Sequence, residues 1–445
     1  MPSPHQPSLS DSPAAPATGV TRAPDGHLWL TPRSAAWLAD RRLAKLMRVV
    51  AGEDEEIRVV GGAVRNALLG RTVSDIDLAT TATPDVVMAR AKSAGMKPVP
   101  TGIDHGTVTV VVDAHPFEVT TLREDVETHG RRATVRFGRD WSADARRRDF
   151  TINALYATAD GEVVDLVGGI SDCLERRIRF IGSPQDRIRE DYLRILRFFR
   201  FHAIYGDGQP DAGGLAACIA LADGIATLSA ERIGQEMLKL VVAEASNRVL
   251  QIMAETGILR RIADFDADVA ALARLNALLG QLPAEMRPTD DAGLRLAALC
   301  GESAAAALHL AERMRLSNAM RDRMVAAIDL SKTVGDDCDE RAVRALVFKA
   351  GNQRTRDCLL VAACRPTAEK LQLRLPDLIV YAASFQRPHL PVNGRDLIRH
   401  GLVPGPDVGA AIATLSERWI DSDFTLDRDR LIATLAPDSP IVPRR

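Results

Sequence analysis

The sequence predicts an α+β fold, with a mixed α/β head near the N-terminus followed by a long all-helical part. Two observations predict this division. From about residue 57 to 170, short runs rich in β-branched residues dominate the chain. Beyond about residue 185 such runs almost disappear, and Leu- and Ala-rich stretches with a 3.6-residue period continue nearly to the C-terminus.

The first residues of the chain are rich in Pro, Ser and Ala and show no hydrophobic period. We therefore expect a disordered tail over residues 1–27, with ordered structure beginning near Leu28. The head is expected to occupy residues 28–170.

Strands and helices alternate within the expected head. Four runs predict the strands of a mixed sheet, namely IRVVGG (57–62), DIDLAT (75–80), GTVTVVVDAHPFEVTTL (106–122) and EVVDLVGG (162–169). Asp113 to Pro116 interrupt the third run and predict a hairpin connection. Two helices are expected between the strands, from AVRNALLG (63–70) and PDVVMARAKSAG (84–95).

The composition excludes several classes of protein. A chain of 445 residues with 46% hydrophobic content suggests about two to four domains. It has no apolar run of about 18 residues and no signal-peptide pattern, so we expect a cytoplasmic protein without a membrane partner. The six cysteines form no CxxC or CxxH pair, which argues against structural zinc. The net charge of −2 makes no case for nucleic acid, although residues 131–148 carry seven arginines against two aspartates.

Two glycines end the first expected strand, and a helix containing an arginine follows. Gly61 and Gly62 have no Cβ, so a ligand can approach the backbone closely, and the amides at the start of the helix would face an anion. Arg65 lies one turn into that helix, within reach of a phosphate. The alternative interpretation is a plain tight turn between a strand and a helix.

Asp75 and Asp77 are separated by one residue in the second expected strand. Strand geometry projects their carboxylates to one face, about 7 Å apart at Cα, while Ile76 and Leu78 face the core. Like charges this close repel each other unless a cation lies between them, and Mg²⁺ prefers carboxylate ligands and nucleotide phosphates. We therefore expect Asp75 and Asp77 to be catalytic and to bind Mg²⁺. The alternative is a solvated strand end.

Glu118 is the candidate for a third acid, which a site with two metal ions would use. It lies in the strand that follows the expected hairpin, and adjacent strands would bring it beside the aspartate pair. The alternative is an outward-facing glutamate in an alternating strand.

GGAVRNALLG followed by DIDLATTATPD resembles the signature of the DNA polymerase β-like nucleotidyltransferases, specifically the bacterial tRNA CCA-adding enzyme and poly(A) polymerase family. Four further blocks resemble later motifs of that family in the family's order, ARRRDFTINAL (145–155), VVDLVGGISDCLERRIRFIG (163–182), REDYLRILRFFRF (189–201) and SAERIGQEMLKLV (229–241). The resemblance covers about residues 57–241. It implies a nucleotidyltransferase head with a mixed sheet, a nucleotide-selecting helical neck over 171–241, and a tRNA-binding helical body and tail over 242–445.

The signature contains one departure from the family pattern. The family usually has an aspartate after the arginine of GGxxR, and this chain has Asn66. An amide keeps hydrogen-bonding capacity and loses the charge, so a turn or capping role could survive and a metal-binding role could not.

Asp191 and Arg194 stand three residues apart in REDYLRILRFFRF, so a helix would place them on one face, with Arg197 and Arg200 continuing a basic stripe. An aspartate accepts a hydrogen bond from an exocyclic amine, and an arginine donates to a ring nitrogen. Cytosine and adenine both present that pair of groups, whereas uracil and guanine reverse it. The resemblance implies that these residues bind and select the nucleotide. The alternative is an exposed helix salt bridge worth a few tenths of a kcal/mol.

The resemblance assigns further residues to the nucleotide. It implies that Gly62, Arg65 and Arg148 hold the triphosphate, since a planar guanidinium can bind phosphate oxygens in a bidentate manner. Gly168 and Gly169 are either a pivot between head and neck or a plain turn. Glu231, Arg232 and Glu236 are expected to form a supporting charge network.

Two segments favour CCA addition within this family. VPTGIDHGTVTVVV (99–112) resembles the GxxHGTV stretch of CCA-adding enzymes, where poly(A) polymerases more often have a basic, aromatic run. The polar segment over 123–144 resembles the flexible loop that accompanies the switch from C to A. The block over 393–415 resembles the C-terminal GxDLxxxGxxxGPxVG motif of many CCA-adding enzymes.

The resemblance therefore implies a Mg²⁺-dependent nucleotidyltransferase that adds C, C and A to the 3′ end of tRNA from CTP and ATP. The helical half is expected to bind the acceptor arm of the tRNA through shape and backbone contacts. Two alternatives are a poly(A) polymerase and a catalytically silent RNA-binding protein on the same scaffold.

Overall fold

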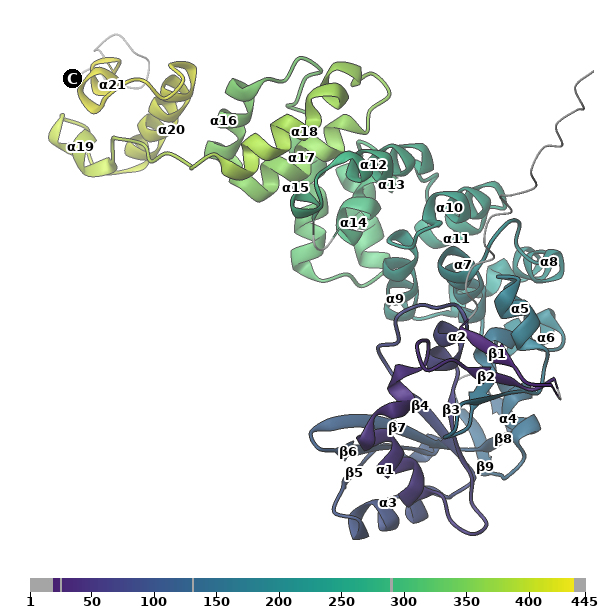
Figure 1. The fold of residues 1–445 in the computed structure, drawn as a ribbon. Helices are drawn as coiled ribbons and strands as arrows, with labels where there is room; N and C mark the ends of the chain where they lie inside the picture. Colours follow the sequence, from purple (N-terminus) through teal and green to yellow (C-terminus); the bar gives the residue numbers. More distant parts are fainter. Residues whose placement is uncertain (1–18, 25, 130–131, 289–290, 436–445) are drawn as a thin grey trace, which may run out of the picture. The chain divides into compact units, whose positions relative to one another are not determined.

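A computed structural model describes residues 19–24, 26–129, 132–288 and 291–435. The chain divides into two compact units, Met1–Arg261 and Ile262–Arg445 (Figure 1). The first unit contains all the strands of the described residues, and the second is helical. The predicted α+β fold class is confirmed.

The head contains a nine-stranded mixed sheet and a separate two-stranded sheet. The nine strands follow the order β1-β2-β11-β10-β3-β4-β7-β6-β5, in which β4 and β7 are parallel and the other neighbours antiparallel. Their bounds are β1 Val20–Arg22, β2 Leu28–Leu30, β3 Ile57–Val60, β4 Asp77–Thr80, β5 Lys97–Gly102, β6 Thr107–Val112, β7 His115–Thr121, β10 Leu155–Ala157 and β11 Glu162–Asp165. The second sheet pairs β8 Arg123–His129 with β9 Arg132–Phe137.

The helices of the first unit cover the sheet and extend beyond it. They are η1 Ala36–Ala39, α1 Arg41–Val50, α2 Gly62–Leu68, α3 Pro84–Ser93, η2 Ile103–His105, α4 Trp141–Arg147, η3 Thr151–Asn153, α5 Gly169–Leu174, α6 Pro184–Glu190, α7 Leu193–Tyr205, α8 Ala212–Ala220, η4 Ala222–Thr227, α9 Ala230–Val241, α10 Ser246–Glu255 and α11 Ile258–Ala263. Helices α1 and α3 pack together, and α3 packs on β5 and β6 (Figure 1).

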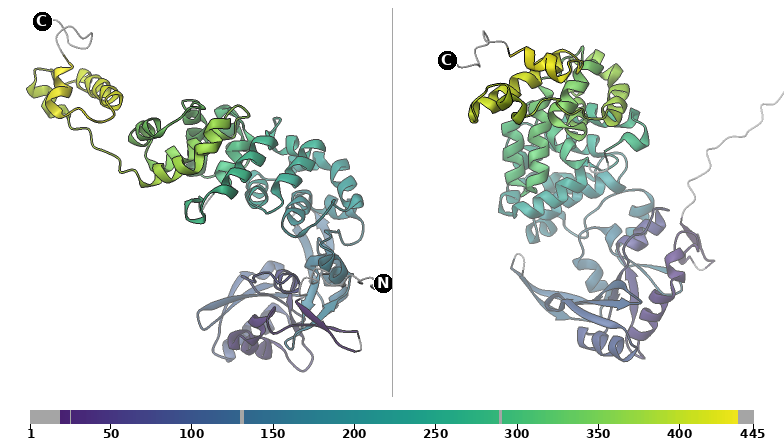
Figure 2. Two further views of the ribbon diagram at one scale, coloured as in Figure 1. Left: turned by 45° about the horizontal axis from the view of Figure 1, so that its top comes forward. Right: turned by 90° about the vertical axis from the view of Figure 1, so that its left-hand side faces the viewer.

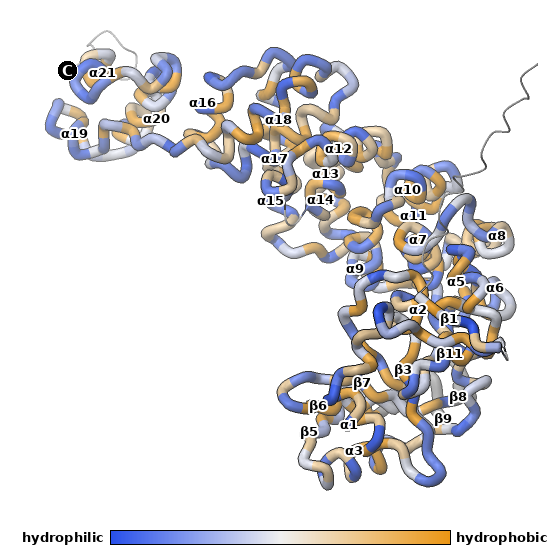
Figure 3. The backbone as a smooth tube through the Cα atoms, viewed as in Figure 1, coloured by the Kyte–Doolittle hydropathy of each residue, from blue (hydrophilic) through white to orange (hydrophobic). Residues whose placement is uncertain are grey.

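Alternation along β6 and β7 gives the sheet one covered face and one open face. Val108, Val110 and Val112 are buried, whereas Thr107 and Thr109 between them are partly exposed. The same period of two residues operates in β7, and hydrophobic residues run along the middle of the sheet (Figure 3). The open face is therefore free to carry polar chemistry.

The predicted hairpin between β6 and β7 is present. Asp113 and Ala114 both have positive φ, 47° and 63°, as a two-residue type I′ turn requires. The predicted polar loop over 123–144 contains the hairpin β8–β9 and most of α4.

Two predicted boundaries are wrong. Residues 20–22, placed in the disordered tail, form β1 because they pair with β2 at the edge of the sheet, while residues 1–18 lie outside the described residues. The second strand begins at Asp77 and not at residue 75. The boundary between neck and body after residue 241 stays a prediction; there, α10 packs on α7 and the Ala245 amide donates to the Ala203 carbonyl (3.1 Å).

An aromatic cluster fixes α7 against the head. Phe150, which follows α4, packs on two other rings. Its ring centroid lies 4.9 Å from that of Phe180 and 5.3 Å from that of Phe201. Phe180 in turn stacks on Phe198 at 5.4 Å. Such pairs add to the free energy of burial, so the helix that carries the predicted nucleotide-selecting arginines is held against the segments that contain Phe150 and Phe180.

Gly168 and Gly169 form a capped turn before α5. Gly168 has a φ of 80°, and a Cβ on Gly169 would overlap the Thr151 carbonyl, so both positions require glycine. The Asp165 carboxylate accepts four backbone amides, from Val167 to Ile170 (2.9–3.1 Å). The structure therefore shows a turn, and a pivoting role stays a prediction.

The second unit is built from packed helices. They are α12 Val269–Gln281, η5 Ala284–Met286, α13 Ala292–Leu299, α14 Ala304–Arg313, α15 Asn318–Ser331, α16 Glu340–Ala350, α17 Asn352–Ala363, α18 Glu369–Ser384, α19 Gly394–Arg399, α20 Pro406–Asp421 and α21 Arg428–Ala433. Helix α17 packs on α15 and α18, and Arg323 binds the buried Asp357 across α15 and α17 (2.7 Å). A stretch without helix, 385–393, joins α18 to α19 (Figure 2).

The C-terminal block predicted from the family resemblance has a capping function in this fold. Asn393 and Asp396 form a capping box at the start of α19, and Arg428 binds the Asp396 carboxylate (2.8 Å). Trp419 and Leu415 of α20 lie in the core that these helices share. The polar residues of the block thus stabilise the local fold.

All six cysteines are buried and free of disulfides, as expected for packing residues. None of the described helices is long and apolar enough to cross a membrane.

We expect His202 of α7 to make the stability of the protein dependent on pH. Its side chain is 1% exposed, and burial, together with the positive charge of Arg248, lowers the pKa of the imidazole. The unfolded chain therefore takes up a proton at higher pH than the folded chain. We expect the free energy of unfolding, measured by urea titration, to fall as pH drops below about 6.5, by up to about 1.4 kcal/mol per pH unit. His202→Gln should lack this component, whereas His389→Gln, at an exposed position, should keep it.

Candidate active site

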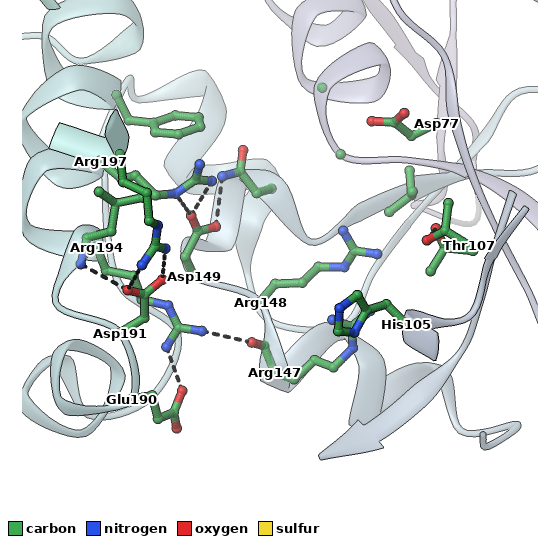
Figure 4. A pocket seen from close by; sticks show the side chains of 18 of the residues that line it. Asp77, His105, Thr107, Arg147, Arg148, Asp149, Glu190, Asp191, Arg194 and Arg197 are labelled. Atoms are coloured by element: carbon green, nitrogen blue, oxygen red, sulfur yellow. Dashed lines mark hydrogen bonds and ion pairs between the residues drawn. The ribbon is translucent and has the colours of Figure 1, made fainter. Parts of the chain in front are cut away.

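The first unit contains a cavity of about 1300 Å³ on the open face of the sheet. Sheet residues line one part of it, and α6, α7 and the start of α9 line another. In Figure 4, Asp77 lies on one side and Asp191, Arg194 and Glu190 on the other, with Arg148 reaching into the space between them. The cavity exceeds the ordinary size of a small-molecule pocket, roughly 300–1,000 Å³.

Asp77 and Glu118 are neighbours on the open face of the sheet. Asp77 is the first residue of β4, and the parallel register of β4 and β7 sets it opposite Glu118. Both side chains line the cavity. The adjacency expected of Glu118 is therefore present.

Asp75 differs from its predicted placement. It lies before β4 in an extended segment, is exposed, accepts a hydrogen bond from the Ser74 hydroxyl (2.8 Å), and does not line the cavity. The two carboxylates thus do not project from one strand. Burial raises the pKa of the Asp77 carboxyl, and the negative charges of Glu118 and Asp75 raise it further. Asp75 is therefore still close enough to influence Asp77.

These residues fit a divalent cation. Carboxylate oxygens are the ligands that Mg²⁺ prefers, and a cation would neutralise the like charges of Glu118 and Asp75, which raise the pKa of Asp77 in addition to burial. Among the described residues, no three acidic, histidine or cysteine side chains converge as a complete metal site. Two carboxylates with water and substrate phosphates are a usual set for Mg²⁺.

Two guanidinium groups flank the turn between β3 and α2. Gly61 has a φ of 71°, which favours glycine. A Cβ built on Gly61 would lie 4.0 Å from Nη1 of Arg148, and one built on Gly62 would lie 3.6 Å from Nη2 of Arg65. All four residues line the cavity, so the predicted triphosphate-binding residues come together in space.

Arg148 is anchored by a buried carboxylate that the sequence analysis did not single out. Asp144, 1% exposed, accepts hydrogen bonds from Nε and Nη2 of Arg148 (3.0 and 2.9 Å), from Arg147 (2.5 Å) and from the Tyr156 hydroxyl (2.8 Å). Asp144 in α4 and Arg148 at the end of that helix are four residues apart, and this spacing was the signal that could have identified the pair.

Asp144→Asn should destabilise the protein by about 3 kcal/mol, because it leaves two guanidinium groups without their buried counter-charge. The free energy of unfolding from urea titration measures the effect. Asp54→Asn, at an exposed position of the head, is the matched control and should change stability by less than about 0.5 kcal/mol. Equal stability of the two variants would contradict the anchoring role.

Asp191 and Arg194 both line the cavity, but not from one helix face. Helix α6 ends at Glu190 and α7 begins at Leu193, so Asp191 lies in the break with an extended backbone (φ −155°, ψ 106°). Its carboxylate accepts two hydrogen bonds from Arg232 (3.0 and 2.6 Å). Arg194 instead binds Glu190 (2.5 Å) and the Arg187 carbonyl (2.8 Å).

The basic stripe predicted on α7 is also divided. Arg197 lines the cavity and binds Asp149 (2.6 Å), which also accepts from the Asn153 amide (2.9 Å). Arg200 does not line the cavity and binds the buried Glu236 of α9 (2.5 Å). Its predicted contact with the nucleotide stays a prediction, since its guanidinium binds Glu236 outside the cavity lining.

The cavity includes polar residues that sequence reasoning missed. They include His105, Thr107, Thr120, Arg147, Asp149, Asn153, Glu190 and Tyr192. Asp149 and Glu190 each adjoin a residue that was predicted, which was the available signal. The expected network of Arg232 and Glu236 is present through Asp191 and Arg200, whereas Glu231 is exposed.

Comparison with known proteins shows the family to which this chain belongs. Residues 57–179 match the family described as "Poly A polymerase head domain", and residues 214–265 match "Probable RNA and SrmB- binding site of polymerase A". The human protein "CCA tRNA nucleotidyltransferase 1, mitochondrial" is 31% identical over 405 residues, covering 88% of this chain and 89% of the relative. The chain belongs to the CCA-adding tRNA nucleotidyltransferase family. The family predicted from the ordered motifs is thereby confirmed.

Other members of the CCA-adding family extend the similarity. The CCA-adding enzyme of Latilactobacillus sakei is 33% identical over 374 residues, covering 82% of this chain and 90% of the relative. The solved Bacillus stearothermophilus CCA-adding enzyme, in complex with CTP, superposes with a TM-score of 0.70 at 27% identity, covering 89% of this chain and 96% of that chain. A Thermotoga maritima CCA-adding enzyme shares the fold, with a TM-score of 0.67 at 19% identity.

Proposed function

We propose that this chain adds C, C and A to the 3′ end of tRNA, using CTP and ATP and releasing pyrophosphate. The observation that carries the proposal is one cavity lined by the acid pair Asp77 and Glu118, by Arg65 and Arg148, and by Asp191 and Arg194. These are the three functions that untemplated nucleotide addition needs, namely charge neutralisation at the reacting phosphate, triphosphate binding and base selection.

Asp77 would hold Mg²⁺, with Asp75 and Glu118 beside it. A bound divalent ion would supply Lewis acidity, lowering the pKa of the terminal 3′-hydroxyl and neutralising charge on the departing pyrophosphate. The carboxylates on the open face of β4 and β7 would hold that ion near the reacting groups. Arg148 and Arg65, beside the Gly61–Gly62 turn, hold the triphosphate for in-line attack.

Asp191 and Arg194 would read the base. The Asp191 carboxylate accepts from the exocyclic amine and the Arg194 guanidinium donates to the adjacent ring nitrogen, which admits cytosine and adenine. Arg232 and Glu190 hold these two side chains in place. The protein, and not a nucleic-acid template, then reads the incoming base.

Residues 242–445 would bind the acceptor arm of tRNA. Supporting this assignment, the Thermotoga relative of similar fold was solved with tRNA. Duplex RNA is recognised mainly by shape and by contacts to its backbone, which suits a long helical surface.

A poly(A) polymerase is the second candidate, because the matching head family carries that description. The 3′-end sequence of a tRNA lacking CCA, after incubation with the protein, Mg²⁺, CTP and ATP, separates the two. We expect products that stop at CCA. Long A tails would favour the polymerase, products ending at CC a partial enzyme, and unchanged tRNA would overturn the proposal. Omission of Mg²⁺ with EDTA should abolish addition.

A further inference from the structure

Arg65 is buried and is held by three side chains from three elements. The residue as a whole is 6% exposed. Nη1 donates to Oδ1 of Asn153 in η3 (2.6 Å), Nη2 donates to the Tyr205 hydroxyl at the end of α7 (2.7 Å), and Nε and Nη2 donate to Oδ1 of Asn66 (3.3 and 3.1 Å). The guanidinium is thus fixed on several sides.

These three acceptors are neutral. Arg65 forms no ion pair within 4.0 Å among the described residues, whereas Arg148, Arg194 and Arg197 in the same cavity each bind a carboxylate. A buried guanidinium ordinarily pairs with an anion, since an uncompensated buried charge is costly. Burial indeed lowers the pKa of Arg65.

Aromatic rings complete the surroundings of the guanidinium. Its central carbon lies 3.9 Å from the Tyr205 ring centroid and 5.4 Å from that of Phe201. A ring face stabilises a cation without neutralising its charge. The same Tyr205 ring also contacts Arg71, 5.3 Å away, in the segment that leads to the acid pair.

We propose that Asn66, Asn153 and Tyr205 are positioning residues that hold Arg65 with its charge uncompensated, so that the triphosphate of the incoming nucleotide becomes its counter-ion. This inference rests on the proposed function and deepens it. It agrees with the place of Arg65 beside Gly62 in the lining of the cavity.

The Asn66 amide bridges Arg65 and the segment that leads to Asp75. Its Oδ1 faces Arg65, while its Nδ2 donates to the Thr72 carbonyl (3.0 Å). The aspartate usual at this position would set a carboxylate against the guanidinium and compensate its charge. The amide instead orients Arg65 and fastens the segment before Asp75 without adding a negative charge.

The test measures equilibrium binding of CTP and of ATP in the absence of tRNA, so that no catalytic step is involved. Asn66→Asp and Asn66→Ala both lose the hydrogen bond to Thr72, and only the aspartate adds a charge. We expect Asn66→Asp to weaken binding of both nucleotides about five- to tenfold, because its carboxylate would form a charged hydrogen bond with Arg65 and compete with the triphosphate. Asn66→Ala adds no charge and should weaken binding less, about two- to threefold. The affinity for inorganic tripolyphosphate, measured by competition, should fall in the same order in these two variants.

One control and one further variant complete the test. Asn318→Asp makes the same change at an exposed position of α15 and should leave nucleotide binding unaltered. Tyr205→Phe removes one acceptor and keeps the ring, and should weaken binding about two- to threefold. Equal binding by wild type and Asn66→Asp, or a larger loss in Asn66→Ala than in Asn66→Asp, would overturn the inference. A wild type that binds nucleotides in this pattern and adds no CCA would overturn the proposed function alone.

Discussion

Asp77→Ala is expected to lower the rate of nucleotide addition at least about a thousandfold, because metal electrostatics and positioning supply most of the catalysis in phosphoryl transfer. Asp77 is the side chain that both lines the cavity and lies opposite Glu118 in the parallel register. Single-turnover addition of CMP to a tRNA lacking CCA measures the rate. Binding of the tRNA itself should be mostly retained, since Asp77 is expected to contact the metal and not the RNA.

Asp85→Ala is the matched control for this measurement. Asp85 is an exposed aspartate in the first turn of α3, outside the cavity lining, so its removal should leave the rate of addition within about twofold. Turnover of Asp77→Ala close to that of Asp85→Ala would refute the assignment of the metal site.

Asp191→Ala is expected to relax base selection more than it weakens tRNA binding. Without the carboxylate, nothing at that position accepts the exocyclic amine of cytosine or adenine or repels the carbonyl of uracil. A site built to form a hydrogen bond discriminates strongly against partners that lack it. We expect incorporation of UMP relative to CMP to rise at least about tenfold, measured by sequencing the 3′ ends formed in equimolar CTP and UTP.

The structure adds a specific control for the second experiment. Asp186 is an exposed aspartate of the neighbouring helix α6, paired with Arg189 and outside the cavity lining. Asp186→Ala should keep the selectivity of the wild type. If Asp191→Ala does so as well, Asp191 only anchors Arg232, and base selection belongs to other residues.

Local patterns in the sequence predicted several features of the head. The alternation of Val and Thr before and after Asp113 predicted the β6–β7 hairpin, because a period of two residues and a short turn are properties of neighbouring residues. The same reasoning placed Glu118 beside Asp77, since strands that share a sheet bring their open faces together. The ordered motifs predicted the family.

Other features depend on contacts between distant residues. Three residues at 20–22 have too little pattern to predict a strand, and β1 forms because β2 supplies its hydrogen bonds. The sequence spacing of Asp191 and Arg194 suggested one helix face, but the chain breaks between α6 and α7, where Arg232, far along the chain, holds the carboxylate.

The sequence by itself determined the fold class, the family and several of the charged residues that line the cavity, because alternation, turn residues and motif order are local properties. Tertiary structure alone decided which charges are compensated. Asp149 binds Arg197, Glu236 binds Arg200, and Arg65 has only neutral acceptors. Whether an arginine meets a carboxylate or an amide from a distant part of the chain depends on which elements pack together, and sequence spacing does not give this information.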